Sequence, residues 1–262
     1  MTDGPVSAPT RRAGMRSLIE ESAFVRVAEL SERFDVSAVT VRGDLEVLES
    51  EGAIRRVRGG AMPAGRLSER PFELSQVDAA DEKARIAAAA VRELEPGMSV
   101  LLDVGTTTAA IARALVADAS VRDLTVITNG LTIALALEAA LDRVDVVVTG
   151  GSLRQLQHSL VAPLADTVLS RVRADVAFIG CSGVDGRAGV TNINLPEAEV
   201  KRAMVAAASR VVVVADASKL GRVHLGRVAQ ADAVDLLITG DGATPTVLGE
   251  LRAAGFPRIL TV

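Results

Sequence analysis

The sequence predicts an α/β protein in two parts, a small N-terminal domain and a larger C-terminal domain. Two observations carry this prediction. Residues 26–61 contain two short helical patterns, a tight turn and a basic segment rich in glycine, whereas from Ser99 onward short apolar runs alternate with helical segments. A chain of 262 residues is also long enough for two domains of unequal size.

The segment 26–61 predicts two short helices joined by a turn. Apolar residues recur at three- and four-residue spacing over 27–34, which is typical of one face of a helix. Ser37 is suited to cap a second helix that runs to about Ser50, because its hydroxyl can accept a free amide of the first turn. The basic segment 53–61 is expected to form a small β-hairpin with a Gly-Gly tip.

Two helices in that relation, followed by a basic hairpin, form a winged helix-turn-helix domain. The second helix is slim enough to enter the major groove of DNA with its first residues against base edges, and arginines of the hairpin can lie over phosphates or in the minor groove. The alternative is a helical packing module that binds nothing, but packing alone does not require three arginines beside a Gly-Gly turn. The residues expected to contact double-stranded DNA are Ser37, Ala38, Thr40, Arg42, Arg55, Arg56 and Arg58.

Short motifs run through this segment in a fixed order, namely Val36-Ser37, Thr40-Val41-Arg42, Asp44-Leu45, Leu48, Glu51-Gly52 and Arg55-Arg56-Val57-Arg58-Gly59-Gly60. Their order and spacing resemble the head of the DeoR-type bacterial transcription regulators. The resemblance implies a head that binds operator DNA. One departure is Gly43, which stands where a second arginine commonly follows Arg42 in that family.

Composition limits the partners and the compartment. The net charge is -4, so binding to nucleic acid must be local, and the hairpin arginines supply a local basic patch. The absence of Trp and Tyr argues against single-strand binding by base stacking. The single cysteine, Cys181, cannot form an internal disulfide, which suits a reducing cytoplasm. No apolar segment has the length of a signal peptide core or of a membrane span, so we expect a cytoplasmic protein with no membrane partner.

The patterns divide the chain into three segments. Residues 11–62 form the expected DNA-binding domain, which begins with a helix over 11–22. Residues 63–80 show little periodicity and are expected to be a linker. Residues 81–262 form the larger α/β domain, which opens with an alanine-rich helix over 81–95.

From Ser99 onward the apolar runs are rich in Val, Ile and Leu, and most show no polar alternation. That composition is typical of strands buried on both faces of a parallel sheet. Because helical segments lie between the runs, we expect a mostly parallel sheet with right-handed crossovers. The expected strands are 100–103, 124–128, 144–149, 176–180, 211–215, 236–239 and 259–262. The expected helices are 107–115, 131–141, 163–170, 195–208 and 246–254.

Ligands of an open α/β sheet bind at the carboxyl ends of the strands. The loops expected there are rich in glycine and threonine, and one of them opens a helix, so together they favour an anion. A small phosphorylated polyol fits them, with its phosphate on the turn 105–107 near Lys219 and its hydroxyls on the carboxylates. The expected ligand residues on these loops are Asp103, Gly105, Thr106, Thr107, Asn129, Gly183, Asp185 and Lys219.

Several motifs of this region follow one another in order: Asp-X-Gly-Thr-Thr at 103–107, Thr-Asn at 128–129, the glycine-rich loop 180–185, Glu-X-X-X-Lys at 197–201 and Asp-X-Ser-Lys at 216–219. They resemble the effector domain of the DeoR-type regulators, which is related in fold to ribose-5-phosphate isomerase. The resemblance covers the chain from about Arg12 to its end. It adds Glu199 and Lys201 to the expected effector site.

Each motif also has a plainer interpretation. Taken alone, the turn 105–107 fits a strand-to-helix connection with a threonine cap, and Lys219 fits a solvated lysine. Asn129-Gly130 alone fits a turn. Cys181, at an apolar strand end, fits a core residue better than a nucleophile. The convergence of several loops on one sheet edge favours the ligand site.

Together these features predict a cytoplasmic repressor of carbohydrate-metabolism genes that binds operator DNA as a homo-oligomer. A phosphorylated sugar in the larger domain would shift the population between DNA-binding and non-binding states. The rival hypothesis is a sugar-phosphate isomerase with an appended head, in which Glu197 or Glu199 is the base. Against it, the loop after Asp185 lacks the further carboxylates and the Lys-Gly-Gly-Gly run of the related isomerases. The spacing of His158 and His224 indicates no metal site. We expect the protein to have no cofactor and not to be an enzyme.

Overall fold

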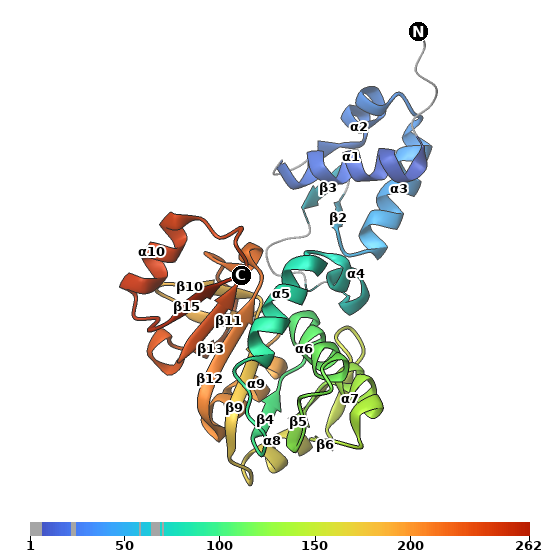
Figure 1. Cartoon of the computed structure of the whole chain (residues 1–262). Coiled ribbons are helices and arrows are strands. Elements are labelled where there is room, and N and C mark those ends of the chain that lie inside the picture. Colours follow the sequence, from blue (N-terminus) through green and yellow to red (C-terminus); the bar gives the residue numbers. More distant parts are fainter. Residues whose placement is uncertain (1–6, 22–24, 58, 64–68, 70) are drawn as a thin grey trace. The chain divides into compact units, whose positions relative to one another are not determined.

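The computed structural model describes residues 7–21, 25–57, 59–63, 69 and 71–262 (Figure 1). The chain divides into two compact units, Met1–Leu74 and Ser75–Val262, which we call the N-terminal unit and the C-terminal unit. The division falls within the segment that we expected to be a linker. The structure adds a short helix there, α4 (Phe72–Val77), whose six residues are too few to show a period in the sequence.

The N-terminal unit contains the elements predicted for a winged helix-turn-helix domain. Its helices pack around one small apolar core, and a three-stranded sheet with the order β1-β3-β2 completes it. The elements are α1 (Ala8–Glu21), β1 (Val25–Arg26), α2 (Val27–Phe34), α3 (Ala38–Ser50), β2 (Ile54–Val57) and β3 (Gly60–Pro63). The core consists of Met15, Ile19, Val25, Leu30, Val41, Leu45, Leu48, Ala53, Ile54 and Ala61.

The helix α3 begins where the sequence predicts. Ser37 is its N-cap, and the Ser37 hydroxyl accepts a hydrogen bond from the Thr40 amide at 3.1 Å. On the core side of α3, the buried carboxylate of Asp44 pairs with the Arg11 guanidinium of α1 at 2.6 Å. This pair compensates the buried charge and joins α1 to α3, so it fixes the orientation of α3 within the unit.

The hairpin differs in one detail from the prediction. β2 and β3 pair antiparallel with Val57 opposite Gly60, so Gly60 belongs to a strand and of the Gly-Gly tip only Gly59 remains in the turn. Gly59 has φ 90°, a left-handed conformation that glycine adopts without strain. β1 adds to β3 as a third strand, and a strand of two residues has no period for the sequence to reveal. Arg58 lies outside the described residues.

A seven-stranded parallel sheet forms the centre of the C-terminal unit, as the sequence predicts (Figure 1). Its order is β15-β14-β12-β9-β4-β5-β6, and each neighbouring pair is parallel. The order reverses between β4 and β9, which is the kind of switch point where open sheets bind ligands. The strands are β4 (Ser99–Leu102), β5 (Leu124–Thr128), β6 (Val144–Val148), β9 (Ala174–Gly180), β12 (Ala208–Ala215), β14 (Leu236–Thr239) and β15 (Ile259–Thr261).

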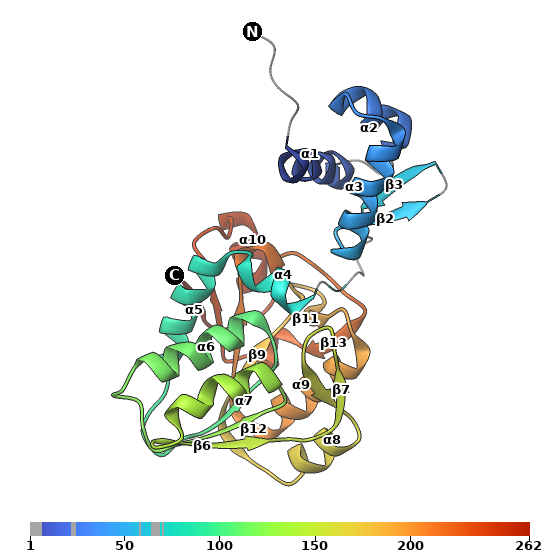
Figure 2. The ribbon, with the colours of Figure 1, turned by 90° about the vertical axis from the view of Figure 1, so that its right-hand side faces the viewer.

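Helices cover both faces of this sheet. Figure 2 shows α5, α6 and α7 side by side, and α8 packs against α9. On β9, Ala177 and Ile179 join the core cluster that contains α9, whereas Val176 and Phe178 are equally buried and point to the opposite face. The helices are α5 (Ala80–Val91), α6 (Thr106–Ala117), α7 (Leu131–Leu137), η1 (Glu138–Ala140), α8 (Leu164–Leu169), α9 (Leu195–Ala207), η2 (Ala217–Lys219), η3 (Ala231–Ala233) and α10 (Pro245–Ala253).

Two small antiparallel sheets were not predicted. One pairs β7 with β8, and the other has the order β10-β11-β13. Their strands have only three or four residues, which is too few for a sequence to show an apolar run or a period. In the described ranges, no helix has the length and hydrophobicity needed to cross a bilayer. The strands are β7 (Ser152–Arg154), β8 (Ser159–Val161), β10 (Gly183–Asp185), β11 (Gly189–Asn192) and β13 (Gly226–Ala229).

Candidate functional site

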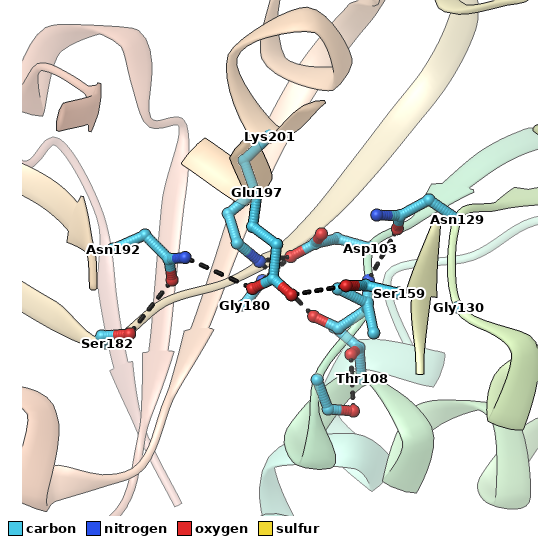
Figure 3. A network of polar contacts seen from close by, with 12 residues as sticks. Asp103, Thr108, Asn129, Gly130, Ser159, Gly180, Ser182, Asn192, Glu197 and Lys201 are labelled. Atoms are coloured by element: carbon cyan, nitrogen blue, oxygen red, sulfur yellow. Dashed lines mark hydrogen bonds and ion pairs between the residues drawn. The ribbon is translucent and has the colours of Figure 1, made fainter. Parts of the chain in front are cut away.

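The first candidate site lies at the switch point, where β4 and β9 end. Asp103, directly after β4, is fully buried, and its Oδ2 accepts a hydrogen bond from the Gly180 amide at 2.9 Å. The ammonium of Lys201, on α9, forms an ion pair with the same carboxylate and reaches the Val104 carbonyl at 3.4 Å (Figure 3). Asp103 therefore joins two neighbouring strands and a helix at one point.

The surroundings of Asp103 and Lys201 set their charges. Burial raises the pKa of the Asp103 carboxyl to about 6, against the opposing pull of Lys201. Burial also disfavours the charged form of Lys201, but the carboxylates of Asp103 and Glu197 outweigh it and raise the Lys201 pKa. The second oxygen of Asp103, Oδ1, is buried and has no hydrogen-bond partner among the described residues. That oxygen is available to accept from a hydroxyl donor.

Glu197 is a second buried carboxylate, on the same face of α9 as the lysine. Its Oε1 accepts from the Ser159 hydroxyl at 2.5 Å (Figure 3). The same oxygen pairs with the Arg154 guanidinium. Its Oε2 accepts from the Asn192 side-chain amide at 3.4 Å. Both oxygens of Glu197 are therefore engaged inside the protein.

The helix α6 begins close to Asp103 and lacks a side-chain cap. Its N-cap, Gly105, has φ 150° and ψ 166°, a conformation almost restricted to glycine. The first turn of α6 starts at the half-buried Thr106 and continues with Thr107 and Thr108. Free amides of a first turn, together with the positive end of the helix dipole, form an anion-binding position.

Lys219 adds positive charge at the same edge of the sheet. It ends η2, the short helix after β12, whose N-cap Asp216 accepts from the Ser218 amide at 3.1 Å. Desolvation raises the pKa of the Cys181 thiol to about 12, and the charges of Lys201 and Lys219 oppose this rise. A thiol with this pKa stays protonated at neutral pH, which argues against a nucleophile.

The second candidate site is the outer face of α3 in the N-terminal unit. Arg42 and Ser37 are exposed, whereas Ala38 and Thr40 are half-buried. The hydroxyls of Ser37 and Thr40 share a hydrogen bond of 2.9 Å, so both belong to the cap of α3. Of these four predicted contacts, Arg42 is the one that is exposed and takes no part in the hydrogen bonds that cap α3.

The hairpin supplies Arg55 and Arg56, both exposed on β2. The Arg56 guanidinium pairs with Glu49 of α3 at 3.0 Å, and the Arg56 amide donates to the same carboxylate at 2.7 Å. The two side chains of this pair are 40% and 39% exposed, where an ion pair contributes about 0–1 kcal/mol. Arg56 can therefore exchange Glu49 for a phosphate at small cost.

The two units match the two parts of one family. Residues 11–64 match the DeoR-like helix-turn-helix domain, and residues 78–241 match the DeoR C terminal sensor domain. The chain belongs to the DeoR family. It is therefore a transcription regulator with a DNA-binding head, and the C-terminal unit is its sensor domain.

Relatives of this DeoR-family chain carry the names of transcription regulators. It is 35% identical over 246 residues to the HTH-type transcriptional regulator GlpR of Haloferax volcanii, with 94% of each chain covered. It is 30% identical over 227 residues to the glycerol-3-phosphate regulon repressor of Escherichia coli K12, with 86% of this chain and 88% of that one covered. Ribose 5-phosphate isomerase A from Methanocaldococcus jannaschii is 19% identical with a TM-score of 0.42, covering 54% of this chain and 55% of that one, a similarity too low to bear on function.

Asn129 of this DeoR-type sensor domain has a different place from the one the sequence indicates. It is fully buried, and its Oδ1 accepts from the Val104 amide at 2.9 Å while its Nδ2 donates to the Leu160 carbonyl at 3.3 Å. Both ends of the amide are thus used within the protein. Asn129 supports the loop after β4 from behind.

Gly183 and Asp185 belong to the β10–β11 hairpin. The Oδ1 of Asp185 accepts from the amides of Arg187 and Ala188, both at 2.8 Å, and so closes the turn. A Cβ on Gly183 would lie 2.3 Å from the Arg222 carbonyl oxygen, so close backbone packing requires glycine there. These contacts give both residues structural roles that do not depend on a ligand.

Glu199 is exposed and pairs with Arg202, so it lies away from the buried network around Asp103. Glu197 is the acidic residue that faces this network, because residues four apart share a face of a helix and residues two apart do not. The helical spacing from Lys201 is the signal in the sequence that selects Glu197. The residues brought together at the sheet edge are Asp103, Gly105, Thr106, Thr107, Lys201 and Lys219.

Proposed function

We propose that this DeoR-family regulator represses genes of carbohydrate metabolism and that a phosphorylated sugar in its sensor domain releases or modulates it. One observation carries the proposal. The uncapped start of α6, the Lys201 ammonium and the unpaired acceptor oxygen of Asp103 lie at the switch point of the sheet, and Lys219 follows β12, the strand next to β9. One relative is named as the repressor of a glycerol-3-phosphate regulon, which supports a phosphorylated polyol as the kind of effector.

The phosphate is proposed to bind the first turn of α6. The backbone of Gly105 reaches the required conformation because glycine has no Cβ, and Thr106 and the buried Thr107 are the first two residues of the helix. A helix N-terminus contributes about 0.3–1 kcal/mol to anion binding, and up to about 2 kcal/mol when partly buried. Lys219 supplies the formal charge that a helix end lacks.

The sugar hydroxyls are proposed to bind Asp103. A buried acceptor without a donor costs about 1–3 kcal/mol, and a ligand hydroxyl on Oδ1 would remove that cost. Lys201 holds the carboxylate in place through Oδ2, so it acts as a positioning residue. A hydroxyl group and a phosphate on one small molecule would then bridge the end of β4 and the start of α6.

In the head, we propose that α3 enters the major groove and that Arg42 reads a base edge. Ser37 and Thr40 hold the start of α3, with Ala38 beside them. Arg55 and Arg56, and Arg58 outside the described residues, are proposed to contact the phosphate backbone.

Two neighbouring residues of α5 offer a route from effector to head. The Glu82 carboxylate accepts from the Ala217 amide at 2.6 Å, next to Lys219. The buried Lys83 ammonium donates to the carbonyls of Ser75 at 2.6 Å and Asp78 at 2.7 Å, at the end of α4. A ligand that moves η2 would therefore change the support of α4. We propose that this change in the support of α4 shifts the population between DNA-binding and non-binding molecules.

We also propose that the protein acts as a homo-oligomer in the cytoplasm. Of the large hydrophobic side chains exposed in the described residues, all except Val39 belong to the C-terminal unit. Contacts between copies are therefore expected there, and paired heads would match paired half-sites in an operator.

The isomerase alternative is disfavoured by the state of Glu197 and Glu199, the two carboxylates that it offers as the base. Abstraction of a proton next to a carbonyl needs a carboxylate with a free oxygen within reach of the substrate. Glu197 has both oxygens engaged by Arg154, Ser159 and Asn192, and Glu199 is turned toward solvent. We therefore propose ligand binding without turnover.

The test uses the full-length protein. Duplexes selected from random DNA should yield one preferred operator, and a panel of phosphorylated sugars should raise the melting temperature and release that operator, whereas the unphosphorylated sugars should not. Selection without sequence enrichment would contradict the regulator. Conversion of an aldose phosphate to its ketose by the same protein would support the isomerase.

A further inference from the structure

Val39 is the one large hydrophobic side chain that the described part of the N-terminal unit exposes. It stands in the first turn of α3, and its exposed fraction of 75% is the highest among the exposed large hydrophobic residues of the described chain. Single exposed hydrophobic residues are common on protein surfaces, so exposure alone does not mark a site. The neighbours of Val39 on α3 indicate what this side chain contacts.

Val39 opens an outward stripe on α3. Val39, Arg42, Gly43 and Glu46 are all exposed, at spacings of three and four residues along one face of the helix. A Cβ on Gly43 would meet no atom within 4 Å, so this face is open. The opposite face carries the core residues Val41, Leu45 and Leu48.

The polar side chains of the first turn are already engaged. Ser37 accepts from the Thr40 amide at 3.1 Å, and the two hydroxyls share a hydrogen bond of 2.9 Å. An engaged hydroxyl has less capacity to read a base than a free one. In the first two turns of α3, Val39 and Arg42 are therefore the side chains best placed to meet base edges.

The chemistry of the groove matches an exposed valine. The major groove presents one apolar group, the C5 methyl of thymine, and a valine can recognise it by burying it. We infer that Val39 reads a thymine methyl in the operator, beside the base read by Arg42. This inference rests on the proposed binding of operator DNA. Three residues of a helix rise about 4.5 Å and one base step about 3.4 Å, so the two contacted bases lie one or two steps apart.

Uracil substitution tests this contact, because uracil lacks only the methyl group and keeps the hydrogen-bonding edge of thymine. An operator selected with the full-length protein is made with uracil at one thymine position at a time. For the natural chain, one position in each half-site should bind about fourfold more weakly, the ratio expected for one buried methyl group. In Val39→Ala, the ratio of thymine to uracil affinity at that position should fall to near one.

Val223→Ala is the matched control, because Val223 is 52% exposed and lies in the C-terminal unit. It should keep the natural ratio, and the melting temperatures of both variants show that they fold. If uracil is tolerated at every position, or if Val39→Ala keeps the fourfold ratio, Val39 does not read thymine. Those results leave the proposed function intact, whereas a natural chain that enriches no DNA sequence removes the proposed function itself.

Discussion

Replacing Lys201 by methionine should destabilise the sensor domain by an amount that depends on pH. The change leaves the Asp103 carboxylate buried without its counter-charge, and the Lys201 and Asp103 side chains are only 3% and 0% exposed, so solvent offers little screening. In the natural protein, burial raises the pKa of Asp103 from 3.8 to about 6 although Lys201 pulls it down. Without Lys201 nothing comparable opposes burial, and the pKa moves above 6.

The direction of the pH dependence follows from the ionisation of Asp103 in the folded state and in the unfolded state. A carboxyl with a higher pKa in the folded state than in the unfolded state makes the free energy of unfolding fall as pH rises between the two values. For natural Asp103 that interval ends at about 6, so its contribution is nearly constant above pH 7. In Lys201→Met the interval extends upward, with a further loss of up to about 1.4 kcal/mol per pH unit. At pH 8 the total cost should approach the ~3–5 kcal/mol of a broken buried ion pair.

Urea unfolding at pH 6, 7 and 8 measures this cost, followed by far-ultraviolet circular dichroism because the chain has no Trp or Tyr. Lys219→Met is the matched control, since Lys219 is half-exposed. The double variant Asp103→Asn/Lys201→Met removes both charges and keeps an acceptor for the Gly180 amide, so it should recover most of the stability and lose the pH dependence. Equal losses at pH 6 and pH 8, with no recovery in the double variant, would refute the reasoning.

Four further predictions concern the head, the effector site and the end of α6. Arg42→Ala should weaken specific binding by about 1–3 kcal/mol in competition among operator variants and relax one base preference, whereas an equal loss on all sequences would mark a phosphate contact. A Cβ at Gly43 would meet no atom within 4 Å. Gly43→Arg should therefore raise the melting temperature, tighten DNA binding and steepen the slope of log affinity against log salt concentration by about 0.9. Weaker binding by a folded variant would show that the glycine fits against DNA. Thr106→Ala and Lys219→Ala should still shift operator DNA and no longer respond to the sugar phosphate, and loss of DNA binding in the folded variants would contradict the assignment. Arg143→Lys should lower the free energy of unfolding by about 1–3 kcal/mol, because the guanidinium donates to four backbone carbonyls at and after the end of α6 and an ammonium cannot match that pattern; an unchanged urea midpoint would count against it.

The parallel sheet could be predicted from the sequence because burial on both faces leaves a direct trace. Strands such as β12 and β14 are continuous apolar runs, and no other common element produces short runs of this kind between helices. The helix-turn-helix was equally accessible, since the Ser37 cap and the spacing of the apolar residues act within a few residues of one another. Local signals of this kind need no knowledge of tertiary contacts.

The interior of the sensor site was less accessible, because its contacts join distant parts of the chain. Asp103 meets a partner 98 residues away in Lys201, and Glu197 meets Ser159 across 38 residues. The sequence showed that Asp103 and Asn129 end strands at one edge. It could not show that Asn129 turns inward to hold Val104 while Asp103 keeps one oxygen unpaired. Glu199 is exposed and pairs with Arg202, whereas Glu197, four residues from Lys201, shares a helix face with that lysine.

The strand order of the sensor domain also determines the order in which the two halves of its sheet are synthesised. β4, β5 and β6 all precede β9 in the chain, and these two halves of the sheet meet along β4 and β9. The first half supplies Asp103, while the second supplies Gly180 and Lys201. Since synthesis runs from the N-terminus, a growing chain displays its DNA-binding head and half of the sheet well before the Asp103 cluster can close. A chain that is still being synthesised should therefore not yet bind an effector, and only the completed chain can respond to one.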